Sequence, residues 1–264
     1  MVGQTSTGGR STDMVQNSRS PSILRKKLLR LADGLRERFG VPSRPRRANI
    51  LDALVQTLLS QSTTDHNRNL AFNELKKQFP DWDAAAAATQ GALARAVRSA
   101  GLGNQKAARV RSFLHWLRDE HGELSLEFLN EKSDTQAVEL LTRHKGIGIK
   151  TAYVTLMWAS DRDLFAVDVH IHRISGRLGL IGAKTTPEKA HSELGPFVPK
   201  GRAFELHVNM LAFGRTICKA SSPKCRECDF RRMCPHYREL NRKNSNQVPE
   251  PKRTRDKLRQ APKN

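Results

Sequence analysis

The apolar positions of this chain recur mostly at helical spacing. Ala71, Leu75 and Phe79 follow one another at intervals of four residues, and Pro80 ends the run. A second stripe steps by three, four and three residues through Ala107, Val110, Leu114 and Leu117. These intervals place the apolar side chains on one face of an α-helix. Alternation with a period of two residues is scarce, so the pattern predicts an all-α protein.

The same periodicity predicts further helices along most of the chain. Their expected ranges are 23–39, 48–60, 83–88, 91–99, 134–143, 149–159, 169–178, 187–194 and 202–213. Asp65, Ser133 and Asp168 are expected N-caps, because a short polar side chain accepts hydrogen bonds from the free amides of the first turn. The expected turns contain four glycines, which are Gly101, Gly103, Gly146 and Gly148.

We expect two helical lobes flanked by two tails. A helical barrel domain is predicted from 46 to 160, and a second helical domain from 161 to 240, which a helix within 23–45 completes. The ends, 1–22 and 241–264, are rich in small polar or basic residues and poor in apolar ones. Such segments bury too little apolar surface to offset the entropy of ordering, so both tails are predicted to be disordered.

The charge balance favours a polyanionic partner. Of 264 residues, 46 are Lys or Arg and 26 are Asp or Glu, which gives a net charge of +20. The two tails carry +6 and +1 of this, so +13 remains in the expected lobes. A basic tail alone therefore does not account for the excess. Release of counterions from nucleic acid makes DNA or RNA the natural partner for such a surface.

The chain has no segment that predicts insertion into a membrane. No stretch approaches the ~18 consecutive apolar residues that span a bilayer, and the N-terminus has no apolar signal core. We expect a soluble monomer in a reducing compartment. The expected location is the cytoplasm of a prokaryote, in association with the nucleoid, while a nucleus or an organelle is the alternative.

Four cysteines lie within 17 residues as C-x6-C-x2-C-x5-C, and the chain has no others; they are Cys218, Cys225, Cys228 and Cys234. Disulfides of a secreted protein are spread along a small chain, so crowding in one segment favours a metal site. Zinc is an alternative, although zinc sites usually set two close ligand pairs well apart. The loops of six, two and five residues favour a 4Fe-4S cluster.

Several cations lie between or beside these cysteines. Lys219, Lys224 and Arg226 are expected to make the cysteine loop a basic surface that contacts DNA. The plain alternative is a solvated face with no partner.

A short glycine turn joins two of the expected helices. Gly146, Ile147 and Gly148 form this turn, and Lys145 precedes it. Two glycines let the backbone approach a phosphate closely, and the amides that open the next helix attract negative charge. Ile147 is expected to pack between the helices, and Lys145 adds positive charge. A bare G-x-G turn is also a common helix connector, so other motifs have to support a role in binding DNA.

Two further motifs supply that support. Lys150 opens the helix after the turn, and Asp168 lies in a V-D-V-H-I segment 18 residues later. Together with the cysteine loop, and in this order, these motifs resemble the endonuclease III branch of the helix-hairpin-helix DNA glycosylases over residues 23–240. The resemblance implies a two-lobed all-α fold with damaged or abasic double-stranded DNA in the cleft, and a structural 4Fe-4S cluster.

The resemblance also implies a reaction. Lys150 is the expected nucleophile at the sugar C1′ of a damaged base, most plausibly a pyrimidine, and forms a Schiff base whose β-elimination cleaves the strand. Asp168 would assist the attack and stabilise the cationic sugar, although helix capping alone is its plain role. One rival is a monofunctional glycosylase that excises mismatched adenine, thymine or uracil with water as nucleophile. Another is a non-catalytic iron-sulfur protein that binds DNA.

Two other segments resemble family loops that enter the duplex. Leu102, between glycines, resembles the leucine that fills the space of an extruded base, although packing under a loop is an alternative. The family glutamine that probes the orphan base falls on Ser62, while Gln61 lies one residue earlier, so either side chain is a candidate. Val169 and Phe213 depart from the residues usual in the family, which leaves the choice of lesion open.

Overall fold

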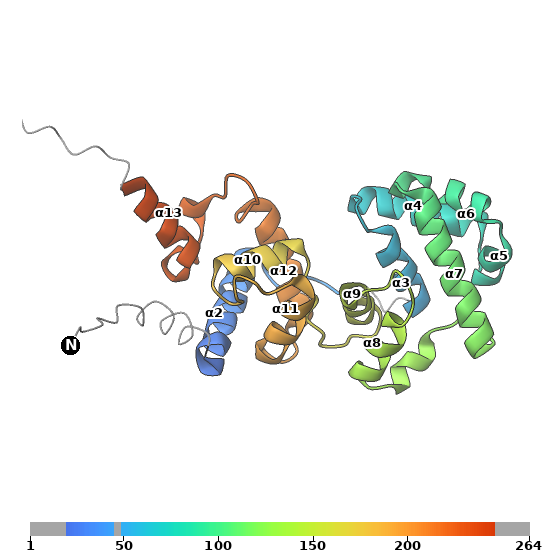
Figure 1. The fold of residues 1–264 in the computed structure, drawn as a ribbon, viewed down its shortest axis with the longest axis horizontal. Helices are drawn as coiled ribbons and strands as arrows, with labels where there is room; N and C mark the ends of the chain where they lie inside the picture. The colour runs from blue at the N-terminus through green and yellow to red at the C-terminus, as the bar shows by residue number, and fades with distance from the viewer. Residues whose placement is uncertain (1–19, 45–48, 246–264) are drawn as a thin grey trace, which may run out of the picture.

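The computed structural model describes residues 20–44 and 49–245. The predicted tails lie mostly in 1–19 and 246–264, outside the described residues, as does the segment 45–48. Within the described ranges every regular element is an α-helix or a short 3-10 helix, arranged as two groups of helices (Figure 1). The prediction of an all-α fold is therefore confirmed.

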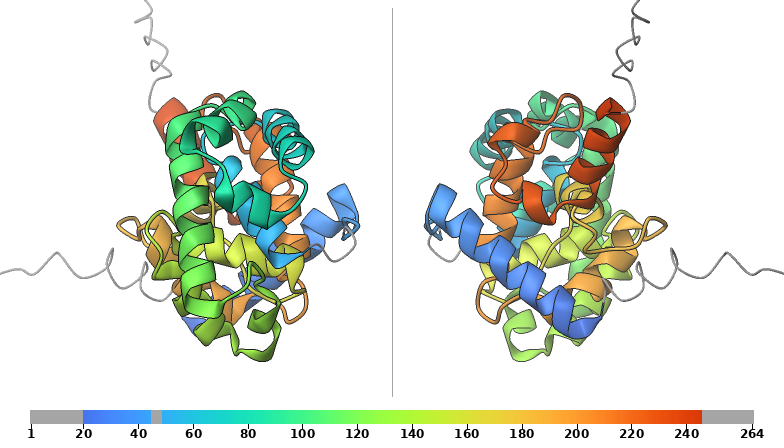
Figure 2. Two further views of the ribbon diagram at one scale, coloured as in Figure 1. Left: turned by 90° about the vertical axis from the view of Figure 1, so that its right-hand side faces the viewer. Right: turned by 90° about the vertical axis from the view of Figure 1, so that its left-hand side faces the viewer.

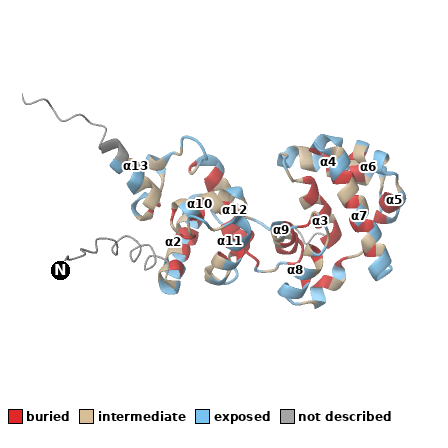
Figure 3. Cartoon of the chain, viewed as in Figure 1, coloured by how far each residue is buried: buried red, intermediate tan, exposed pale blue. Residues whose placement is uncertain are grey.

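The first lobe contains seven consecutive α-helices. They are α3 (Ile50–Leu59), α4 (Asp65–Gln78), α5 (Trp82–Ala87), α6 (Gln90–Ala96), α7 (Gly103–His121), α8 (Asp134–Thr142) and α9 (Ile149–Ala159). Their buried faces meet in one apolar core that extends from Ile50 to Leu164 (Figure 3). The long helix α7 runs along one side of this lobe (left view of Figure 2).

The second lobe combines the two ends of the described chain. Its helices are α2 (Pro21–Phe39), α10 (Val169–Arg177), α11 (Pro187–Leu194), α12 (Ala203–Thr216) and α13 (Pro235–Ser245). They share a separate core, in which α2 packs against α12 (right view of Figure 2). α13 extends to Ser245, into the range predicted as a disordered tail, and Tyr237 near its start packs against this core. The domain boundaries themselves stay a prediction.

The predicted helix ends agree with the structure at two of three caps. Ser133 forms a reciprocal capping box with Gln136 at the start of α8. Asp168 accepts a hydrogen bond from the amide of Ile171 at 2.8 Å and caps α10. The third cap was wrong, because Thr64 has the extended backbone of an N-cap and accepts the amide of Asn67, while Asp65 already belongs to α4.

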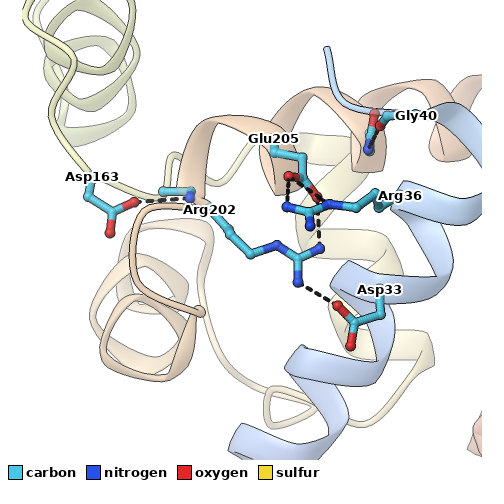
Figure 4. A network of polar contacts seen from close by, with 8 residues as sticks. Asp33, Arg36, Gly40, Asp163, Arg202 and Glu205 are labelled. Atoms are coloured by element: carbon cyan, nitrogen blue, oxygen red, sulfur yellow. Dashed lines mark hydrogen bonds and ion pairs between the residues drawn. The ribbon is translucent and has the colours of Figure 1, made fainter.

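A buried ion-pair network joins α2 to α12 (Figure 4). The side chain of Glu205 is 8% exposed and accepts hydrogen bonds from Arg36 at 2.5 to 3.2 Å and from Arg202 at 2.8 Å. Arg202 also donates to Asp33 on α2 at 2.5 Å. Burial raises the pKa of Glu205, but the hydrogen bonds from Arg36 and Arg202 outweigh it, so the pKa lies below its ordinary value.

The connector between the two lobes is hydrogen-bonded to backbone amides beside this ion-pair network. Asp163 accepts the amides of Gly201 and Ala203 at 2.5 and 3.0 Å, and Ala203 is the first residue of α12. The amide of Ala203 lies in the first turn of α12 and has no partner within that helix. The segment that leads to Asp168 is therefore anchored to the start of α12.

A buried lysine connects two helix ends inside the first lobe. Lys106 is 2% exposed, and its ammonium donates to the carbonyl oxygens of Leu59 at 2.8 Å and Ala100 at 2.7 Å. Leu59 ends α3, and Ala100 ends the 3-10 helix before Leu102. One cation thus satisfies the terminal carbonyls of two helices, and it connects the loops that contain Leu102 and Gln61.

Among the described helices, none combines the length and the apolar character needed to cross a bilayer.

Candidate catalytic and DNA-binding site

The glycine turn lies between α8 and α9, as the sequence predicts for a helical hairpin. Ile147 is buried in the core of the first lobe, and Gly148 is the exposed residue that precedes α9. Gly146 has a φ of +95°, which a side chain rarely adopts, and a Cβ there would lie 3.0 Å from Cδ of Arg109. Lys145 is exposed beside it. The turn therefore presents backbone and one cation to solvent, with Arg109 packed against it.

Lys150 and Asp168 line the same pocket, although they belong to different lobes. The pocket has a volume of about 180 Å³, and its lining includes Gly148 of the hairpin, Val169 and His191. Lys150 is exposed in the first turn of α9, and Asp168 is half-buried at the start of α10. An amine and a carboxylate are thus brought to one concave surface beside the hairpin, from positions 18 residues apart.

His191 is a member of this pocket that the sequence motifs do not mark. It is 2% exposed, and its Nε2 accepts the amide hydrogen of Val167 at 3.0 Å. Burial lowers the pKa of His191, and the charge of Lys150 lowers it further. The nearby His207 is also buried, and burial lowers its pKa in the same direction. These two histidines differ from others in the chain by their burial and by their hydrogen bonds to residues distant in the sequence, which the sequence motifs do not show.

Leu102 has the exposure that a residue entering the duplex requires. Its side chain is 55% exposed, and its backbone is left-handed with a φ of 51°. A left-handed conformation costs a residue other than glycine about 1–3 kcal/mol, and it persists only where the surrounding structure imposes it. Packing beneath a loop, the plain alternative for Leu102, does not describe this side chain.

Gln61 and Ser62 occupy the loop after α3 in different ways. The Oε1 atom of Gln61 accepts a hydrogen bond from Nη1 of Arg109 at 2.5 Å. Ser62 has a left-handed backbone with a φ of 54°. Because Arg109 also packs against Gly146, it connects the loop of Gln61 to the hairpin. The NH₂ donors of Gln61 and the second lone pair of its Oε1 remain available for other partners.

The four cysteines line one cavity in the second lobe. Arg177 and Tyr237 contribute to the same lining, and Nη1 of Arg177 lies 3.4 Å from Sγ of Cys218. Burial, together with a smaller contribution from the neighbouring cysteines, raises the pKa of the Cys228 thiol to about 11. Cysteine thiolates are ligands of zinc and of iron-sulfur clusters. The donor set therefore suits a metal centre.

In the described part of the chain, no group of three or more His, Cys, Asp or Glu side chains is arranged to hold one metal ion. A zinc ion binds sulfur at about 2.3 Å and requires its four ligands to converge on one point. Four cysteine thiolates bind zinc in some proteins and iron-sulfur clusters in others, and the four thiols of this chain line one cavity.

The cations predicted in the cysteine loop are at the surface. Lys219, Lys224 and Arg226 are all exposed. Lys224 lies 3.4 Å from Glu227, a contact between two exposed side chains that contributes little to stability. These residues are therefore accessible to a polyanion.

Comparison with known proteins shows the family. Residues 55–200 match the family described as HhH-GPD superfamily base excision DNA repair protein, and this range contains Lys150, Asp168 and His191. The chain belongs to this superfamily. It is a base excision repair DNA glycosylase of the endonuclease III type, which confirms the resemblance found in its motifs.

Individual relatives agree with this assignment. Endonuclease III of Thermotoga maritima is 32% identical over 70% of this chain and 82% of its own length. A candidate DNA glycosylase of Arabidopsis thaliana is 34% identical over 64% of this chain, which spans only 58% of that relative. An endonuclease III in a non-covalent complex with DNA superposes with a TM-score of 0.70 at 25% identity, over 83% of this glycosylase and 98% of that chain.

Proposed function

We propose that this glycosylase excises a damaged base, with pyrimidines the first candidates, and then cleaves the strand as an AP lyase. The observation that carries the proposal is that Lys150 and Asp168 line one pocket beside the hairpin. The Lys150 amine attacks C1′ while the base leaves, which forms an imine with the opened sugar. Loss of a C2′ proton then breaks the bond between C3′ and its phosphate. Asp168 stabilises the positive charge on the sugar.

The surrounding surface is suited to a bent and opened duplex. In this proposal the turn Gly146–Gly148 and Lys145 bind the phosphate backbone, while Leu102 fills the space of the extruded nucleotide. Gln61 and Ser62 are both candidates to face the orphan base, and Gln61 is already hydrogen-bonded to Arg109. In this proposal the glycosylase associates with the nucleoid of a prokaryote, with a nucleus or an organelle as the alternative.

The same proposal includes a 4Fe-4S cluster held by the four cysteines that line one cavity. The cluster would organise the loop that presents Lys219, Lys224 and Arg226 to DNA, with no part in bond breaking. Purified protein is expected to contain iron and acid-labile sulfide in equal amounts, and Cys225→Ser should lower both. Zinc in place of iron would contradict this assignment.

A panel of duplexes, each with one lesion or mismatch, tests the reaction. Base release and strand cleavage are scored with and without borohydride, which reduces an imine to a stable covalent adduct. We expect release, cleavage and a trapped adduct on at least one damaged pyrimidine. Base release without an adduct would establish water as nucleophile, and binding without release would favour the non-catalytic alternative.

A further inference from the structure

His191 lies between the two walls of the candidate pocket. Its ring meets Tyr153 edge-on, with 5.1 Å between the ring centroids, and Tyr153 is three residues after Lys150 on α9. The same ring accepts the amide hydrogen of Val167, the residue directly before Asp168. One side chain on α11 therefore contacts both the helix that carries Lys150 and the segment that carries Asp168.

The partners of His191 define its protonation state. Nδ1 lies 2.9 Å from the carbonyl oxygen of Pro187, which can only accept, so this nitrogen carries the proton. Nε2 lies 3.0 Å from the amide nitrogen of Val167, which can only donate, so this nitrogen is unprotonated. His191 is consequently a neutral imidazole, in agreement with the lowering of its pKa by burial.

His207 binds the other end of the same peptide group. Its Nδ1 lies 2.9 Å from the carbonyl oxygen of Ala166, and the side chain is buried on α12. The oxygen of Ala166 and the amide of Val167 belong to one peptide bond, and both residues are almost fully buried. Two histidines from two helices thus hold both polar ends of the peptide that precedes Asp168.

We propose that His191 and His207 are positioning residues for Lys150 and Asp168. By holding the peptide between Ala166 and Val167, they set the place of the Asp168 carboxylate relative to the Lys150 amine. Neither histidine needs to touch the sugar, because reaction rates fall steeply when reacting groups move by about 1 Å. This inference rests on the proposed function, since it assumes that Lys150 and Asp168 act together.

Two substitutions of His191 separate its hydrogen bond from its packing. His191→Phe keeps a ring against Tyr153 but leaves the amide of Val167 without an acceptor. His191→Gln places Oε1 where it accepts that amide. With saturating enzyme, we expect His191→Phe to slow single-turnover adduct formation by about 100-fold, and His191→Gln to recover most of the rate.

Binding and stability are measured on the same variants. Affinity for a duplex with a non-cleavable abasic-site analogue should stay within about three-fold of wild type, since His191 is only 2% exposed and the proposal gives it no contact with DNA. Leu75→Ala, in the core of the other lobe, serves as a destabilised control, and all rates are taken where circular dichroism shows folded protein. Equal rates for the Phe and Gln variants, or a wild-type rate for His191→Phe, would overturn the proposal.

A measurement without substrate keeps this inference distinct from the proposed function. In NMR spectra of ¹⁵N-labelled protein, the imidazole signals that the wild type shows and His191→Gln lacks are those of His191. We expect these signals to be those of a neutral ring protonated at Nδ1. A ring protonated at Nε2 near neutral pH would refute the geometry. Failure of the wild type to release a base or form an adduct would instead refute the proposed function, whatever the tautomer of His191.

Discussion

Lys150→Gln is expected to abolish the borohydride-trapped adduct and to lower base release by about 1,000-fold or more, because the amide cannot form an imine. The side chain is exposed in the first turn of α9, so the substitution should leave folding unchanged. Rates are measured in single turnover on the best substrate of the duplex panel, and affinity is measured on the non-cleavable abasic duplex.

Lys145→Gln is the matched control, because it removes an exposed lysine of the same hairpin outside the pocket lining. This variant should bind DNA more weakly and with a salt dependence smaller by about one phosphate contact, yet form the adduct at saturating enzyme. Retained trapping in Lys150→Gln would show that another amine is the nucleophile. Loss of trapping in both variants to the same degree would assign Lys150 to DNA binding.

Glu205→Gln is expected to lower the free energy of unfolding by about 3 kcal/mol, because removing one partner of a buried ion pair leaves the other charge uncompensated. Arg202 is the charge that loses its buried partner, since its side chain is only 14% accessible and it keeps only Asp33, which is 52% accessible. The side chain of Arg36 is 45% accessible and reaches water. Urea denaturation of the two proteins at neutral pH measures the difference.

The pH dependence of the free energy of unfolding provides a second test of the ion-pair network of Glu205. The folded-state pKa of Glu205 lies below its unfolded value, so its ionisation stabilises the fold above the ordinary glutamate pKa, and this contribution is lost as pH falls through the folded-state pKa. Glu205→Gln should lack that part of the acid dependence. Glu227→Gln, which alters an exposed pair with Lys224, should unfold like the wild type. Equal effects of both substitutions would exclude the network as a major source of stability.

Local signals were enough to predict much of the molecule. Apolar spacing predicted most helices to within a few residues, and the polar residues before α8 and α10 predicted the caps Ser133 and Asp168. Such features depend on neighbours within one or two turns, so the sequence displays them directly. The cap at Asp65 was wrong because Thr64 offers a competing hydroxyl one residue earlier, and propensity alone does not decide between the two.

The sequence by itself determined the helical class, the order of the motifs and the residue types available for chemistry. Only the tertiary structure decided that Glu205 meets Arg36 across 169 residues, and that His191 and His207 hold one peptide before Asp168. Burial and the partners of a buried polar group depend on how distant helices pack. A local sequence pattern shows neither the burial of a single histidine or glutamate nor the distant partner of its side chain.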